Sequence, residues 1–179
     1  MCGRYYVKAG IGAASRDIHP SDSALVLINE NASVTEKRMR WGFPGVHGKG
    51  LIFNARSEGA LDRKMFRDST LHRRCVIFAD GFYEWDRMKN KASFERMDGK
   101  PLYMAGIWNI FDNEERFAIL TTRANASVAD VHDRMPLVLE KDEADRWIMD
   151  DKCVDFILNK TPVPLTRSSG FVQQTLKFE

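Results

Sequence analysis

The chain has 179 residues, of which 44% are hydrophobic and 29% charged, and its formal net charge is +2. This length and composition predict a single globular domain over residues 1–179 and exclude a disordered or fibrous protein. The longest apolar runs, such as Ala24–Ile28, are far shorter than the roughly 20 residues of a membrane-spanning helix, so we expect no membrane segment.

The termini and the cysteines indicate the compartment. The N-terminus does not have the basic and apolar pattern of a secretory signal, so we expect a cytoplasmic protein. The three cysteines (Cys2, Cys75 and Cys153) are widely spaced, which predicts reduced thiols and suits neither a disulfide framework nor a metal site.

The charges are unevenly distributed along the chain. Residues 1–80 carry 13 Lys/Arg against 8 Asp/Glu, and residues 81–179 carry 14 Lys/Arg against 17 Asp/Glu. The basic half permits binding of a polyanion without requiring it.

Short alternating or apolar runs separated by turn residues predict a sheet that is largely antiparallel. Turn sequences occur at Asn29-Glu30-Asn31, at Asp98-Gly99-Lys100-Pro101 and at Asp112-Asn113-Glu114, where they predict hairpins. The predicted strands are Arg4–Val7, Ala24–Ile28, Val34–Trp41, Leu51–Phe53, Arg74–Ala79, Phe82–Trp85, Leu102–Ile110, Arg116–Thr122 and Leu137–Leu139.

Helical periodicity is limited to short segments, so the fold class is α+β with strands dominant. The predicted helices are Glu58–Phe66, Ala126–Val131, Asp142–Met149 and Val154–Leu158. The glycine-rich stretch Gly42–Gly50 is a candidate lid or substrate-contacting loop.

Cys2 is the most unusual position for chemistry. Removal of Met1 would leave an N-terminal cysteine whose α-amine has a pKa near 7.7, against about 10.4 for a lysine, so the amine is a nucleophile at neutral pH. A 1,2-aminothiol condenses with an aldehyde to an imine, and the thiol then closes a five-membered thiazolidine ring. The same thiol can serve as the nucleophile of a peptidase or amidohydrolase. A buried strand-start cysteine without a function is the remaining alternative.

Three further residues suit acid–base work or orientation of a substrate. Glu84 lies in the aromatic run Phe82-Tyr83-Glu84-Trp85, where desolvation raises a carboxyl pKa as a general acid requires; the alternative is a solvent-facing strand residue. His132 lies in a loop before a strand and can shuttle protons or be structural. Asn54 and Arg56 follow a short strand and present an amide and a guanidinium, unless they only begin a helical turn.

Taken together, these residues resemble the SOS response-associated peptidase (SRAP) family, whose members crosslink to abasic sites in single-stranded DNA. The matching segments occur in the family's order from residue 1 to about Leu139. They are Met1-Cys2-Gly3-Arg4, Arg40-Trp41-Gly42, Phe53-Asn54-Ala55-Arg56-Ser57-Glu58, the run from Cys75 to Trp85, and His132-Asp133-Arg134-Met135-Pro136-Leu137-Val138-Leu139. Two segments depart from the family pattern, Arg16–Pro20 and Leu165–Gly170. The resemblance implies a curved, barrel-like, mostly antiparallel mixed sheet flanked by a few short helices.

The resemblance also implies roles for individual residues. Cys2 would form the crosslink to the abasic site, Glu84 would transfer protons and assist the self-cleavage that exposes Cys2, His132 would assist opening of the sugar ring, and Asn54 would orient the amine or sugar. The expected DNA contacts are Arg4, Trp41, Gly42, Arg56, Arg74, Trp85 and Arg134, with Trp41 stacking on a base. No cofactor or metal is implied, and we expect a monomer with single-stranded DNA as partner. A cysteine peptidase acting in trans and a non-catalytic single-stranded DNA binder are the alternatives.

Overall fold

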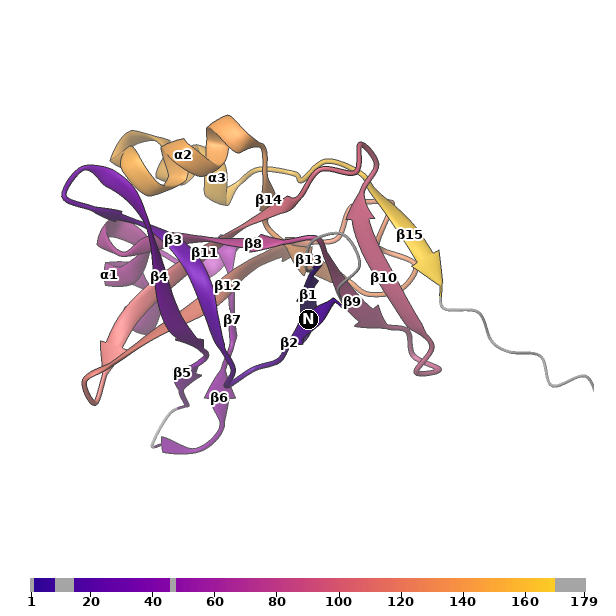
Figure 1. The fold of residues 1–179 in the computed structure, drawn as a ribbon, viewed down its shortest axis with the longest axis horizontal. Coiled ribbons are helices and arrows are strands. Elements are labelled where there is room, and N and C mark those ends of the chain that lie inside the picture. Colours follow the sequence, from indigo (N-terminus) through magenta and orange to yellow (C-terminus); the bar gives the residue numbers. More distant parts are fainter. Residues whose placement is uncertain (1, 9–14, 46–47, 170–179) are drawn as a thin grey trace, which may run out of the picture.

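The computed structural model describes residues 2–8, 15–45 and 48–169, and its centre is a closed five-stranded barrel (Figure 1). Four of the five neighbouring pairs are antiparallel, and the parallel pairing of β12 with β4 closes the ring. The barrel strands are β3 (Ser23–Glu30), β4 (Ser33–Trp41), β8 (Arg74–Ala79), β11 (Leu102–Phe111) and β12 (Glu114–Arg123). This architecture confirms the predicted curved, mostly antiparallel mixed sheet.

Short strands extend the barrel at its edges. β7 (Asn54–Arg56) runs parallel to β12 beyond β4, and β13 (Arg134–Pro136) pairs antiparallel with the C-terminal end of β12. β14 (Val138–Leu139) pairs with β11, and β5 (Phe43–Pro44) with β6 (Leu51–Ile52). The strand predicted at Leu137–Leu139 is thus interrupted at Leu137, whose backbone N–H donates to the Leu120 carbonyl while its carbonyl accepts from Ala105.

A second sheet of five strands lies beside the barrel (Figure 1). Its order is β15 (Leu165–Ser169), β10 (Lys91–Arg96), β9 (Gly81–Trp85), β1 (Tyr5–Val7) and β2 (Arg16–Ile18), all antiparallel. The chain therefore passes from one sheet to the other at the turn of residues 98–101, because β10 pairs with β9 and β15 whereas β11 belongs to the barrel. The prediction of a hairpin at this turn was wrong, although Gly99 does adopt a turn conformation with φ of 68°.

The two remaining turn predictions are confirmed. Asn31 and Ala32 both have positive φ between β3 and β4, and so do Asp112 and Asn113 between β11 and β12. Two consecutive residues with positive φ are the signature of the tight turn whose twist matches that of antiparallel strands.

Helices cover one part of the barrel surface. α1 (Lys64–His72) and α2 (Lys141–Met149) pack against β8 and β11, and α3 (Val154–Leu158) follows a 3-10 turn, η3 (Asp151–Cys153). The predictions for α2 and α3 are confirmed. The helix predicted at residues 58–66 is instead a 3-10 turn, η2 (Ser57–Gly59), followed by α1, because Arg63 has an extended backbone that separates them. Residues 126–131 form successive turns rather than a helix.

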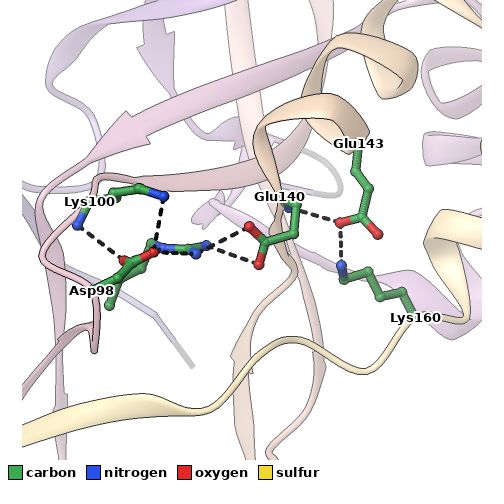
Figure 2. Close-up of polar contacts among 6 residues, drawn as sticks. Asp98, Lys100, Glu140, Glu143 and Lys160 are labelled. Carbon is green, nitrogen blue, oxygen red and sulfur yellow. Dashed lines mark hydrogen bonds and ion pairs between the residues drawn. The ribbon is translucent and has the colours of Figure 1, made fainter.

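An ion-pair network joins the sheet-switching turn to α2 (Figure 2). Arg96 at the end of β10 pairs with Asp98 at 2.9 Å and with Glu140 at 3.1 Å. Glu140 is the N-cap of α2 in a capping box with Glu143, which in turn pairs with Lys160. Because Arg96 is largely buried, this network fixes β10, and with it the neighbouring β9, relative to the barrel.

The described residues contain no helix that is long and apolar enough to cross a membrane.

Candidate active site

Four chain segments meet where the second sheet touches the barrel. Cys2 lies three residues before the start of β1, Asn54 begins β7, Glu84 lies on β9, and His132 lies in the loop before β13. Hydrogen bonding in the second sheet sets this arrangement, since the Tyr83 N–H donates to the Arg4 carbonyl at 2.9 Å and β9 pairs with β1. The strands thereby bring Glu84 next to the start of the chain.

Asn54 contacts Cys2 directly. Its Nδ2 donates to the Cys2 carbonyl at 2.8 Å, while β7 is anchored in the barrel by the pairing of Asn54 with Ile119 of β12. The Asn54 Oδ1 is buried and has no hydrogen-bond partner among the described residues. A buried amide oxygen without a partner is an acceptor available to a donor placed beside Cys2.

Glu84 is buried, with 3% of its surface exposed, and it alternates along β9 with the half-buried Tyr83 and Trp85. Burial raises the pKa of Glu84, and the nearby charge of His132 opposes this effect only in part. The alternative of a solvent-facing glutamate is wrong. A carboxyl group in this environment holds its proton to higher pH than an exposed one, as a general acid must.

The Cys2 side chain is fully buried. Burial raises the pKa of the Cys2 thiol, and the charge of Glu84 raises it further. The thiol is therefore held in its neutral form, and the carboxyl group of Glu84 lies within electrostatic range of it.

His132 is half-buried, and its Nδ1 accepts a hydrogen bond from the Arg134 backbone N–H at 3.0 Å. The neutral ring therefore carries its proton on Nε2. Asp133 Oδ1 also lies 3.0 Å from Nδ1, a contact that is favourable only when that nitrogen is protonated. His132 thus has a partner in each protonation state, which suits a residue that passes protons.

Two adjoining clefts flank His132. The first has a volume of about 790 Å³ and lies between Trp85–Met88 and Ala129–Asp133. The second, of about 480 Å³, is lined by Arg56, Arg123 and Arg134 and shares Ala129 and Asp133 with the first. Together they form an open surface that contains the guanidinium groups of these three arginines beside His132.

The arginines differ in how firmly they are held. Arg134 forms a bidentate pair with Glu58 at 2.7 and 2.9 Å, whereas Arg56 is exposed. Arg4 pairs with Asp17 at 2.5 Å and lies over the Tyr83 ring, on the outer face of the second sheet. Sequence reasoning missed Arg123, although its position directly after the predicted strand Arg116–Thr122 was a usable signal.

Three residues predicted to contact DNA lie inside the protein. Trp41 is 0% exposed, stacks on Phe117 and donates its Nε1–H to the Phe53 carbonyl at 2.8 Å, so it has no face on which a base can stack. Arg74 is buried against α2, where it donates to the Trp147 carbonyl at 2.5 Å and pairs with Asp151. Gly42 is also buried, at a φ of +112° against Leu51. These three residues belong to the core and cannot contact DNA from these positions.

Of the glycine-rich loop of residues 42–50, Val46 and His47 lie outside the described residues. Within the described ranges, no cluster of three or more His, Cys, Asp or Glu side chains is arranged to hold a metal ion.

Comparison with known proteins identifies the family, because the family model described as SOS response associated peptidase (SRAP) matches residues 8–164. The chain belongs to the SRAP family. It is 34% identical to the abasic site processing protein YedK of Escherichia coli K12 over 140 residues, or 74% of this chain and 63% of that one. It is 29% identical to the abasic site processing protein YoaM of Bacillus subtilis, covering 75% and 65%. The chain thus spans less than two thirds of the length of these curated relatives.

Solved structures show the same fold. A phage-related protein from Bordetella bronchiseptica superimposes with a TM-score of 0.79 and 22% identity over 94% of both chains. A second protein from the same organism also gives a TM-score of 0.79 at 22% identity, covering 96% of this chain and 100% of its own. At this level of identity the likeness concerns the fold alone.

Proposed function

We propose that this SRAP protein binds abasic sites in single-stranded DNA and forms a thiazolidine crosslink through Cys2 after Met1 is removed. The observation that supports this most directly is the meeting of Cys2, Asn54, Glu84 and His132 at one place in the fold. The SRAP relatives are named abasic site processing proteins, which points to the same substrate. The crosslink shields the lesion during the DNA damage response.

The first step is imine formation. The freed α-amine of Cys2 attacks the aldehyde carbon of the ring-opened deoxyribose, and the carbinolamine loses its hydroxyl as water to give a C=N bond. Protonated Glu84 donates the proton that leaves with this water, and its raised pKa keeps it protonated closer to neutral pH. Asn54 Oδ1, which is buried and has no hydrogen-bond partner in the described part of the chain, accepts a hydrogen bond from the amine and orients it.

The second step is ring closure. The Cys2 sulfur bonds to the imine carbon, the π electrons move to nitrogen, and the thiol proton is transferred to that nitrogen, so the five-membered ring is neutral and no atom is lost. Glu84 relays this proton. The high pKa of the Cys2 thiol fits this order of events, because the amine reacts first and the thiol needs to lose its proton only when the imine is present.

His132 acts before these steps. An abasic sugar is mostly a closed hemiacetal, and opening it requires a proton to be moved from the hydroxyl to the ring oxygen. His132 has a hydrogen-bonded partner in both its neutral and its protonated states, so it can give and take that proton.

The DNA lies along the two clefts beside His132. Arg56, Arg123 and Arg134 bind phosphates there, and half-buried Trp85 offers an aromatic surface to a flanking base. Arg4 adds a cation at the edge of the second sheet. These contacts position the strand, and the chemistry is left to the four residues around Cys2.

The same carboxyl group assists removal of Met1. The Cys2 thiol attacks the carbonyl carbon of Met1, the peptide C–N bond breaks to leave a thioester on sulfur, and Glu84 relays the thiol proton to the departing α-amine of Cys2. Water then hydrolyses the thioester, which releases Met1 and restores the thiol; this is the autopeptidase activity that the family name suggests. A peptidase acting in trans is less favoured, since it needs a site that recognises a separate peptide, whereas an aldehyde needs only the aminothiol. A reversible DNA binder is less favoured because it needs no buried carboxyl beside a thiol.

The decisive experiment mixes the protein with single-stranded DNA containing one abasic site and resolves the products on a denaturing gel. Wild type forms an adduct that survives without reductant, Cys2→Ala loses it, and Cys2→Ser gives only a labile imine that needs borohydride. Cys75→Ala removes a thiol that is equally buried within the barrel and keeps the adduct, which makes it the matched control. An equally durable adduct from Cys2→Ala would show that another amine reacts.

A further inference from the structure

A third pocket, separate from the two clefts beside His132, lies where the barrel strands β3 and β8 diverge. Pairing between these strands covers only Val26–Ile28 and Cys75–Ile77, although β3 begins at Ser23 and β8 continues to Ala79. The resulting gap in the barrel wall holds a pocket of about 550 Å³. We call it the β3–β8 pocket, and it shares no lining residue with the clefts beside His132.

The walls of the β3–β8 pocket are apolar and partly exposed. Leu25 on β3 is 48% exposed and Phe78 on β8 is 38% exposed, and both line the pocket. The Phe78 ring meets Tyr103 of β11 edge-on, with 6.1 Å between ring centres. Large apolar side chains gathered around one hollow, rather than scattered singly, are typical of a recognition surface.

Cations outnumber carboxylates around this pocket. Lys8, Arg16, Arg38 and Lys141 line it, against Glu36 alone. Of the four cations, Lys8 pairs with Glu95 and Lys141 with Asp145. Arg16 and Arg38 have no carboxylate partner in the described part of the chain. Two unpaired guanidinium groups from different strands therefore border an apolar hollow.

Tyr5 supplies a further polar group. It lines the β3–β8 pocket, and its hydroxyl is buried without a hydrogen-bond partner among the described side chains and backbone. A buried hydroxyl without a partner is uncommon in folded proteins and indicates a site that is completed by something else.

We propose that the β3–β8 pocket receives an extended acidic segment of a partner protein, with one large apolar side chain in the hollow and carboxylates on Arg16 and Arg38. The apolar walls would hold the large apolar side chain, and the two arginines without an ion-pair partner would bind the carboxylates on either side of it. The separated edges of β3 and β8 leave room for an extended backbone between them, which favours a peptide over a compact small anion. The proposal does not depend on the crosslinking chemistry at Cys2.

The test uses fluorescein-labelled peptides in which two aspartates stand on each side of a phenylalanine, tryptophan, leucine or isoleucine, with binding followed by fluorescence anisotropy. At least one should bind wild type, and Arg38→Glu and Phe78→Ser should each weaken it by about tenfold or more. Two control variants change exposed residues outside the pocket, Arg67→Glu on α1 and Phe156→Ser on α3. The Phe156 side chain is 62% exposed, and both variants should bind the peptides as wild type does. Thermal melting confirms that each variant is folded.

Three results would overturn the proposal. One is the absence of binding by all four peptides at about millimolar concentration, the weak end of specific affinity. Another is equal binding when the aspartates are replaced by lysines. The third is a wild-type dimer that Phe78→Ser abolishes, since a second copy of the chain would then occupy the pocket. Crosslinking of abasic DNA should be unchanged in Phe78→Ser, so failure here is distinct from failure of the proposed function.

Discussion

Glu84→Gln separates the two functions that a buried carboxyl can have, acid–base catalysis and packing. Glutamine keeps the shape of the side chain and an oxygen acceptor but cannot release or take up the proton. Because only 3% of Glu84 is exposed, bulk water is poorly placed to replace it as the proton donor. General acid–base catalysis is typically worth about 10²–10⁴-fold, or roughly 3–5 kcal/mol of barrier, so we expect a loss of this size in the crosslinking rate.

The assay is a single-turnover time course with saturating abasic single-stranded DNA, from pH 5 to pH 8. The ratio of the wild-type rate to the Gln-variant rate should fall as the pH rises through the raised pKa of Glu84, because the protonated acid is depleted in wild type while deprotonation of the Cys2 amine affects both proteins alike. Glu95→Gln, on the neighbouring strand β10 where the carboxylate pairs with Lys8, is the matched control and should keep the wild-type profile. Wild-type rates in Glu84→Gln at every pH would mean that Glu84 is structural.

The same substitution has a consequence for stability whose sign follows from the direction of the pKa shift. A carboxyl whose pKa is raised by folding binds its proton more tightly in the folded state, so wild-type stability declines as the pH rises above the unfolded value near 4.5. Glu84→Gln should therefore melt at a higher temperature than wild type at pH 8, and the difference should shrink toward pH 4. A difference that grows on acidification would contradict the assigned burial effect.

The remaining predictions concern orientation, DNA contact and the core. Asn54→Ala removes the 2.8 Å hydrogen bond to the Cys2 carbonyl, so it should slow crosslinking at saturating DNA, as measured by gel time courses. The affinity for DNA, measured by fluorescence anisotropy, should not change, and a reduced affinity would place Asn54 in DNA binding instead. Arg56→Ala should lower the salt dependence of single-strand binding by about 0.7 in log–log slope, and saturating DNA should restore crosslinking; failure to recover would place Arg56 at the reacting centre. Trp41→Ala should cost about 3–5 kcal/mol of folding stability, measured by denaturant titration, while DNA affinity in the folded protein stays unchanged. Trp85→Ala should have the opposite pattern, weakening single-strand affinity by roughly 1–3 kcal/mol with little effect on stability.

Local sequence information determined most of the secondary structure. The hairpins at Asn31 and at Asn113 could be predicted because turn residues that tolerate positive φ follow alternating strands. The strand Arg74–Ala79 and the helix Val154–Leu158 occur at the predicted bounds. The β9–β10 hairpin escaped prediction because its turn, with Lys89 at a φ of 66°, contains no glycine, and β10 is largely polar.

The candidate site could be predicted in part. The alternation in Phe82–Trp85 predicts that Glu84 and Phe82 share one face of the strand, but it left open whether that face is buried or exposed. The aminothiol chemistry of Cys2, by contrast, depends only on covalent structure. That Asn54 meets the Cys2 carbonyl could not be derived, because the two residues are 52 positions apart and approach each other only through the pairing of β7 with β12.

What the tertiary structure alone decided is which side of each strand faces water. Trp41 stands in a segment that matches the family pattern, Arg74 directly precedes another, and sequence reasoning assigned both to DNA. In the fold, closure of the barrel by the parallel β12–β4 pair encloses Trp41, and α2 packs over Arg74, where the Trp147 carbonyl accepts a hydrogen bond from it. The alternation of residues along a strand shows which of them share a face. Whether that face is exposed depends on other elements, distant in sequence, that pack against it only in the folded chain.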